Sequence, residues 1–211
     1  MHVLGGAYAC SRMRYAPALR HRRSLRLRGY DYSRTGAYFV TVCVQGRLSL
    51  FGEIMGEGLS ATPAGLMVEK WWRALPEKFA RVETDVSAVM PNHFHGIVII
   101  TQPVGADPCV RPDHPVRPGQ PVSAIALPAV MQWFKTMTTN EYIRRVNERG
   151  WTPFAGRLWQ RGYYERVIRD ERELERVRRY VVDNPAKWAT DRENPAAREA
   201  AVGRTIGTSR W

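Results

Sequence analysis

The sequence predicts an α+β fold, with a mainly antiparallel, ferredoxin-like sheet and helices packed on one face. Three observations predict it. Segments rich in β-branched and aromatic residues occur in adjacent pairs, amphipathic helical segments separate these pairs, and the order is strand, strand, helix, strand, strand, helix, strand, helix. The chain has 211 residues, which is the size of one ordinary domain with appendages.

The first strand is predicted over residues 37–44. These residues are apolar, aromatic or β-branched almost throughout, which is typical of a strand buried on both faces. Residues 45–47 (Gln-Gly-Arg) form the turn that follows, and residues 48–54 are expected to form a short partner strand.

A helix is predicted over residues 63–79, with Thr62 as its N-cap and a proline at its first position. Its apolar residues recur every three or four positions, and Pro76 is expected to kink the last turn. Two further strands follow, over residues 82–90 and 96–101.

The second half begins with residues 102–122, which are rich in Pro, Gly and Val without periodicity and predict a loop-like insertion. A long helix is expected over residues 128–148, because apolar residues follow one face of it. Residues 158–168 contain the last predicted strand, and Asp170 caps a final helix over residues 171–183.

Charge is the most informative feature of the composition. Lys and Arg number 32 and Asp and Glu number 20, so the formal net charge is +12. Arginine supplies 28 of these cations, and eight of them lie in residues 1–34 against one acidic residue. Such an excess favours a polyanionic partner, because arginine forks bind phosphates and stack on bases. The alternative is a general bias of the composition toward arginine.

This distribution divides the chain into three parts. Residues 1–34 are expected to form a basic N-terminal arm that contacts a polyanion, residues 35–188 a folded domain with its insertion, and residues 189–211 a polar tail. No run approaches the roughly 18 apolar residues of a membrane helix. The N-terminus also lacks the apolar stretch of a signal peptide, and the three cysteines form no metal or disulfide pattern. A cytoplasmic protein is expected.

The strongest chemical motif is His93-Phe94-His95. If it begins a strand, the two imidazoles project from one face while Phe94 points to the other. Two imidazoles at this spacing suit one divalent cation, although an isolated motif of this kind more often has a structural role.

The last helix offers a reactive group and a further ligand. Tyr180 and Asn184 are four residues apart, so they lie about one turn apart on one face of this helix. An amide oxygen of Asn184 is able to complete a metal site with the histidines. In the alternative interpretation, Asn184 only ends the helix before Pro185 and Tyr180 only borders the core.

Five sequence blocks, in this order, resemble the REP-associated tyrosine transposases, a group of single-tyrosine HUH transposases. The resemblance spans approximately residues 22–188. The blocks are YDYS with GAYFVT (Tyr30 to Thr41), MPNHFHGIVI around the two histidines, WFKTMTTNEYI (Trp133 to Ile143), LWQRGYYERVIRD (Leu158 to Asp170) and RRYVVDNPAKW (Arg178 to Trp188).

The resemblance implies an HUH endonuclease fold and a single-stranded DNA endonuclease and strand transferase. His93, His95 and Asn184 would hold a divalent metal, magnesium or manganese, and Tyr180 would form a 5′-phosphotyrosine intermediate. The partner would be hairpin DNA from palindromic repeats, which places the protein at the bacterial nucleoid. We expect a monomer, with a dimer as the alternative. The expected DNA contacts are Arg22, Arg23, Arg26, Arg28, Tyr30 and Arg161.

Competing assignments remain at the level of single residues. Tyr163 and Tyr164 are the other candidate nucleophiles, although a predicted strand position favours a supporting role. Glu165, Asp170 and Glu171 are alternative ligands, because a neutral amide binds magnesium weakly.

Competing functions remain as well. One is a protein that binds structured single strands without cutting them. Another is a relaxase or replication initiator with the same chemistry, which the block matches and the absence of a helicase segment disfavour. An unrelated metal hydrolase is least favoured, because five scattered histidines supply too few ligands.

Overall fold

The computed structural model describes residues 29–56, 58–102 and 125–198. The elements in chain order are β1 (Gly36–Cys43), η2 (Gln45–Arg47), β2 (Gly52–Met55), β3 (Gly58–Ala61), α1 (Pro63–Arg73), α2 (Leu75–Lys78), β4 (Val82–Met90), β5 (His93–Ile100), α3 (Leu127–Arg149), β6 (Tyr164–Ile168), α4 (Glu171–Asp183) and η3 (Pro185–Thr190).

Four strands form the main sheet in the order β4-β5-β1-β6, and every neighbouring pair is antiparallel. The hairpin β4-β5 lies on one side of β1, and β6 lies on the other. This order follows when one helical connection joins β1 to β4 and a second joins β5 to β6, as in a ferredoxin-like fold. The predicted α+β class with an antiparallel sheet is therefore confirmed.

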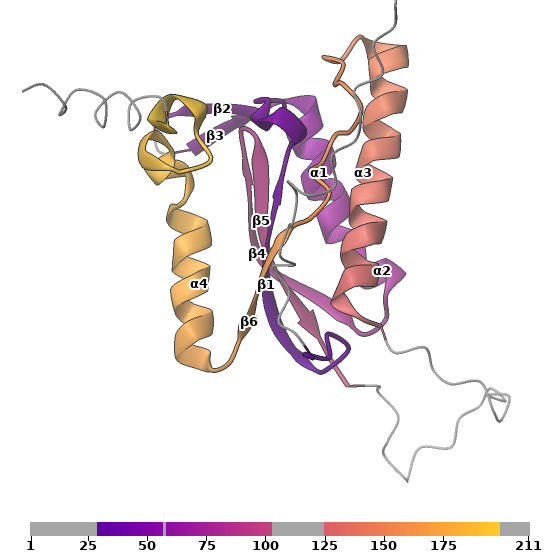
Figure 1. The fold of residues 1–211 in the computed structure, drawn as a ribbon, viewed down its shortest axis with the longest axis vertical. Helices are drawn as coiled ribbons and strands as arrows, with labels where there is room; N and C mark the ends of the chain where they lie inside the picture. The colour runs from indigo at the N-terminus through magenta and orange to yellow at the C-terminus, as the bar shows by residue number, and fades with distance from the viewer. Residues whose placement is uncertain (1–28, 57, 103–124, 199–211) are drawn as a thin grey trace, which may run out of the picture.

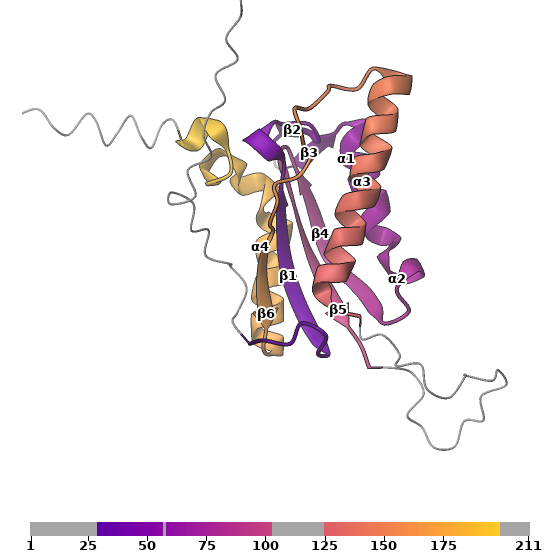
Figure 2. The ribbon, with the colours of Figure 1, turned by 45° about the vertical axis from the view of Figure 1, so that its right-hand side comes forward.

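The helices occupy both faces of the sheet, which corrects the prediction that they pack on one face. Helices α1, α2 and α3 lie on one side of the sheet, and α4 lies alone on the other (Figures 1 and 2). Two separate hydrophobic clusters match this division. Because the central strands bury side chains on both faces, the sheet needs a cover on each side.

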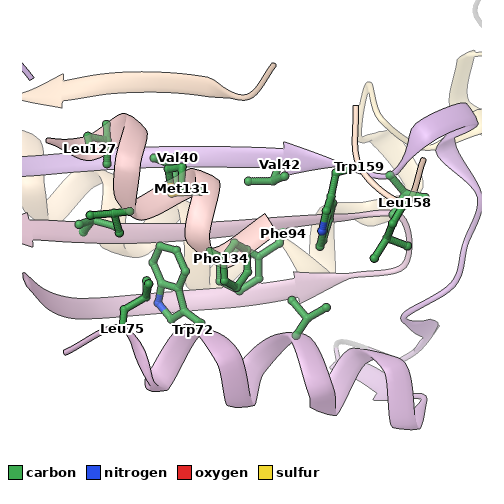
Figure 3. Packing of buried hydrophobic residues seen from close by; sticks show 14 of the residues in the cluster. Val40, Val42, Trp72, Leu75, Phe94, Leu127, Met131, Phe134, Leu158 and Trp159 are labelled. Atoms are coloured by element: carbon green, nitrogen blue, oxygen red, sulfur yellow. The ribbon is translucent and has the colours of Figure 1, made fainter. Parts of the chain in front are cut away.

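The larger cluster fills the space between the sheet and the helices of the connections. Figure 3 shows Val40 and Val42 of β1 and Phe94 of β5 packed against Trp72 of α1 and Phe134 of α3. The ring centroids of Trp72 and Phe94 are 4.7 Å apart. Gly96 permits this approach, because a Cβ atom there would lie 2.4 Å from the indole of Trp72.

The smaller cluster joins α4 to the opposite face of the sheet. It contains Phe39, Ile97 and Ile168 from the strands together with Val177 and Val181 from α4. The side chain of Asp170 accepts a hydrogen bond from the amide of Glu173, which confirms the predicted N-cap of this helix.

Several predicted boundaries were wrong. The segment 48–54 contributes only β2, which pairs with β3, a strand that was not predicted, and not with β1. The predicted helix 63–79 is divided at Ala74 into α1 and α2. Strand β5 begins at His93 and not at residue 96, so both histidines lie within it.

Within the described residues, no helix is long and apolar enough to cross a membrane. The predicted insertion 102–122 lies almost wholly outside the described residues.

Candidate functional site

The two histidines lie at the start of β5, on the face of the sheet that α4 covers. Their Nε2 atoms are 2.9 Å apart. Both side chains are almost fully buried. Two ligand atoms about 2.1 Å from one cation, at a right angle around it, would be about 3 Å apart. The spacing of the two nitrogens therefore fits a shared divalent cation.

Each imidazole is held at its other nitrogen. Nδ1 of His93 lies 2.9 Å from Oδ1 of Asn92, and Nδ1 of His95 lies 2.8 Å from Oγ1 of Thr41. The amide oxygen of Asn92 only accepts, so Nδ1 of His93 carries the proton and its Nε2 presents a lone pair. A hydroxyl both donates and accepts, so Thr41 suits either tautomer of His95. Partners of this kind orient histidines that bind metals.

Burial is also the main reason that both histidines are neutral. It lowers the pKa of His93 to about 3, with a further contribution from the charge of Arg47. Burial likewise lowers the pKa of His95 to about 3, with His93 as the second cause. Neutral imidazole is the form that binds a metal.

Tyr180 lies on α4 beside this pair. Its ring centroid is 5.4 Å from that of His95 and 5.8 Å from that of Phe39, and the side chain is 45% exposed. Burial and the charge of Asp191 raise the pKa of Tyr180, while a hydrogen bond from Asn184 opposes them. An accessible phenol beside two histidines is suited to nucleophilic attack at a metal site.

Asn184 follows at the C-terminal end of α4. Its side chain is buried, and among the described residues no group hydrogen-bonds to its Oδ1 atom. A buried oxygen without a partner is costly unless a ligand satisfies it. The chemistry of this oxygen therefore fits the predicted role of Asn184 as a metal ligand.

Asp191 also reaches the histidines, although sequence reasoning did not select it. Ligand atoms of His93, His95 and Asp191 all lie within 4.8 Å of one another. Asp191 follows η3, in the segment that was predicted to be a polar tail. No short motif joins it to the histidine strand, so only the fold brings these groups together.

The other proposed ligands lie elsewhere. Val40 pairs with Glu165 while Thr41 pairs with Tyr164, so Glu165 faces away from the histidines and Tyr164 faces toward them. The carboxylate of Asp170 caps α4, and Glu171 is exposed at the start of this helix.

A hollow of about 1170 Å³ opens beside the site. Aromatic side chains and a surplus of cationic ones line it, which suits a single strand whose bases stack while its phosphates are neutralised. The aromatic residues are Phe39, Tyr163, Tyr164 and Tyr180, the cations are Arg47, Arg161, Arg166, Arg176 and Arg192, and the acids are Glu173, Asp191 and Glu193.

The structure places the predicted DNA contacts in different positions relative to this hollow. Arg161 is exposed and lines the hollow. Tyr30 does not line it, because its ring packs against those of Tyr32 and Tyr38, at centroid distances of 5.0 and 6.5 Å. The four arginines predicted in the N-terminal arm, Arg22, Arg23, Arg26 and Arg28, lie outside the described residues.

Comparison with solved structures finds several similar chains, among them the following two. One is a REP-associated tyrosine transposase bound to a REP hairpin, with a TM-score of 0.46 and 15% sequence identity, covering 77% of this chain and 73% of that one. The other is a Deinococcus radiodurans protein assigned as a transposase, with a TM-score of 0.39 and 14% identity, covering 74% of this chain and 94% of that one.

No family model matches the sequence. An uncharacterized protein of Haemophilus influenzae is 33% identical over 184 residues, which cover 84% of this chain and 96% of that protein. The two proteins therefore share most of their length as well as a third of the aligned residues, and the chain belongs to the same family as the Haemophilus influenzae protein.

Proposed function

We propose that this protein is a metal-dependent endonuclease and strand transferase acting on single-stranded DNA, with Tyr180 as its nucleophile. The observation that carries the proposal is the position of this accessible tyrosine, whose ring lies 5.4 Å from that of His95 in a buried, neutral histidine pair. The five sequence blocks shared with the REP-associated tyrosine transposases support it.

In the proposed reaction, the phenolic oxygen of Tyr180 attacks the scissile phosphorus. The bond from phosphorus to the 3′ oxygen breaks, which leaves a free 3′-OH and a 5′-phosphotyrosine. The covalent bond keeps the phosphodiester energy, so a second 3′-OH reseals the strand and releases Tyr180.

His93, His95 and Asn184 would hold a divalent metal, either magnesium or manganese. When bound, such a cation acts as a Lewis acid on the phosphate and neutralises developing charge. The protein itself keeps both imidazoles neutral and fixes them through Asn92 and Thr41. Hydrogen bonding from Asn184 would lower the pKa of Tyr180 and favour the phenolate, whereas burial and the charge of Asp191 raise this pKa and favour the phenol.

The proposed substrate is a DNA hairpin from palindromic repeats with an adjacent single-stranded segment. Arg161 would contact the strand in the hollow, and the N-terminal arm would contact the hairpin through phosphates first and bases second. Because the aromatic and cationic residues that line the hollow suit a backbone with unpaired bases, we propose single-stranded DNA in preference to a duplex. We further propose that the protein acts as a monomer on the bacterial nucleoid.

A denaturing gel tests the reaction. Labelled single-stranded DNA from the repeats that flank the gene is incubated with the protein and Mn²⁺ or Mg²⁺. We expect a cleaved strand and a covalent adduct that both require metal, and that are lost in Tyr180→Phe and in the double variant His93→Ala/His95→Ala. The variants Tyr163→Phe and Tyr164→Phe serve as matched controls and are expected to retain the adduct.

Two outcomes would contradict the proposal. An adduct that persists in Tyr180→Phe and disappears in Tyr163→Phe or Tyr164→Phe would assign the nucleophile to another tyrosine. Tight hairpin binding without cleavage in either metal would instead indicate a binding protein for structured single strands.

A further inference from the structure

We infer that Asp191 is a carboxylate ligand of the metal centre, supplied by the segment that follows the tyrosine helix. This inference rests on the proposed function and deepens it. It adds a negatively charged ligand to a set that otherwise consists of two imidazoles and one amide, all neutral. It also extends the catalytic unit beyond residue 188, as far as about residue 194.

The first observation is the position of the carboxylate. A ligand oxygen of Asp191 and the ligand nitrogens of His93 and His95 lie within 4.8 Å of one another. Both imidazoles are already oriented by Asn92 and Thr41. Asp191 also lines the same hollow as His95 and Tyr180.

The second observation is that the residue that orients His93 also holds the segment carrying Asp191. The Nδ2 atom of Asn92 donates to the carbonyl of Glu193 at 2.8 Å and to that of Arg47 at 3.3 Å, while its Oδ1 atom accepts from His93. Asn92 is 1% exposed. One buried amide thus fixes the positions of the histidine and of the segment relative to each other.

An ion pair anchors the same segment a second time. Arg47 binds the carboxylate of Glu193 at 2.9 Å and donates to the carbonyl of Arg192 at 3.2 Å. The thiol of Cys43 lies 3.6 Å from the same carboxylate. Cys43 is paired with His93 across β1 and β5, so the anchor is built on the strand next to the histidines.

Local hydrogen bonds set the direction of the carboxylate. The Oδ1 atom of Asp191 accepts from the amide of Glu193 at 2.6 Å, and the amide of Asp191 donates to the carbonyl of Trp188 at 3.0 Å. The ring of Trp188 packs beside that of His93, with centroids 5.9 Å apart. A carboxylate has several lone pairs, so Asp191 can accept the hydrogen bond from Glu193 and bind a metal at the same time.

The chemistry of the ligands favours this assignment. Magnesium and manganese are hard cations that prefer oxygen ligands, and a carboxylate binds them more strongly than a neutral amide. Without the cation, the charge of Asp191 would repel the phosphates of a strand in the hollow that it lines. Asp191 thus has two effects, stronger metal binding and DNA binding that depends on the metal.

The experiment measures Mn²⁺ binding by isothermal titration calorimetry and by the electron paramagnetic resonance signal of free Mn²⁺. The Asp191→Asn variant keeps an oxygen that accepts from the amide of Glu193, so it removes the charge and preserves the turn. We expect its dissociation constant for Mn²⁺ to rise at least about tenfold. The control is Asp183→Asn, which makes the same change at an exposed residue paired with Lys187, and we expect no change.

A second measurement uses a fluorescent single-stranded oligonucleotide with the Tyr180→Phe background, which prevents turnover. In EDTA, we expect Asp191→Asn to bind the oligonucleotide more tightly than its parent, because the repulsion is gone. Addition of Mn²⁺ should increase the affinity of the parent more than that of the variant.

Mn²⁺ and oligonucleotide affinities of Asp191→Asn within twofold of the parent values would overturn the inference. If such a variant still forms a metal-dependent adduct through Tyr180, the proposed function stands and only the role of Asp191 fails. If the wild type binds no Mn²⁺ and forms no adduct, both proposals fail together.

Discussion

Thr41 lies in the middle of the site, because it pairs with His95 on one side of β1 and with Tyr164 on the other. Its hydroxyl is the partner of Nδ1 in His95, at 2.8 Å. If Nε2 of His95 binds a metal, Nδ1 carries the proton and would donate a hydrogen bond to the hydroxyl oxygen of Thr41. We therefore propose that Thr41 positions His95 for metal binding.

The variant Thr41→Val tests this role because it keeps the branched shape and removes the hydroxyl. We expect the affinity for Mn²⁺ to fall about 10-fold to 100-fold, as for other partners of metal-binding histidines. The variant Thr41→Ser, which restores the hydroxyl, should recover most of the affinity. Equal affinity in Thr41→Val and the wild type, measured by calorimetry, would show that the imidazole needs no such partner.

At the scale of single residues, the sequence predicts the kind of chemistry at the site better than it predicts the complete set of residues that form the site. The alternation of a strand places His93 and His95 on one face, and the helical repeat places Tyr180 one turn before Asn184. Asp191 carries no such local signal, because a 3-10 helix and a turn separate it from α4. The roles of these five residues (His93, His95, Tyr180, Asn184 and Asp191) remain predictions. They lie close together because strands far apart in the sequence pair in the sheet, and sequence spacing alone does not predict that pairing.

At the scale of elements, the way in which α4 packs against the sheet determines the position of Tyr180. Strand β4 has a register irregularity between Thr84 and Ser87, which is the position of Asp85. Both Nε and Nη2 of Arg178 donate to Oδ2 of Asp85, at 2.9 and 2.7 Å. This ion pair joins α4 to the edge strand two residues before the tyrosine.

We expect Arg178→Gln to lower the cleavage rate by up to about 100-fold, because small misplacements of a nucleophile are costly. Its free energy of unfolding should change little, since the ion pair is partly exposed. Arg179→Gln, which changes an exposed neighbour paired with Glu175, is the control. Single-turnover kinetics and urea denaturation provide the two measurements, and equal rates in both variants would exclude a positioning role.

The error in helix placement has a physical origin at this same scale. The first strand, predicted as buried on both faces, already required a cover on each side of the sheet. The stripe of Leu174, Val177 and Val181 on α4 supplies the second cover. Periodicity reveals that a helix has an apolar face, but not which face of the sheet it contacts. The sequence did not predict the hairpin β2-β3, because its strands have only four residues each and bury few side chains.

At the scale of the whole molecule, the net charge of +12 should make DNA binding strongly dependent on salt. Each phosphate neutralised on a single strand contributes about 0.7 to the slope of log K against log salt concentration. We expect Arg161→Gln to reduce this slope by about 0.7, because Arg161 lines the hollow beside the site.

The matched control is Arg149→Gln, at the exposed C-terminal end of α3 and outside that hollow. Fluorescence anisotropy with a single-stranded oligonucleotide at several salt concentrations gives both slopes. A slope that changes equally in the two variants would mean that charge acts only through the overall field, without a defined path for the strand.

The sheet order also divides the reactive groups between the two halves of the chain. Residues 29–102 contain both histidines, and residues 125–198 contain Tyr180, Asn184 and Asp191. The halves meet along β1, which pairs with β5 of its own half and with β6 of the other. Neither half holds the proposed nucleophile Tyr180 together with the histidine pair, so completion of the sheet would be the event in folding that assembles the proposed site.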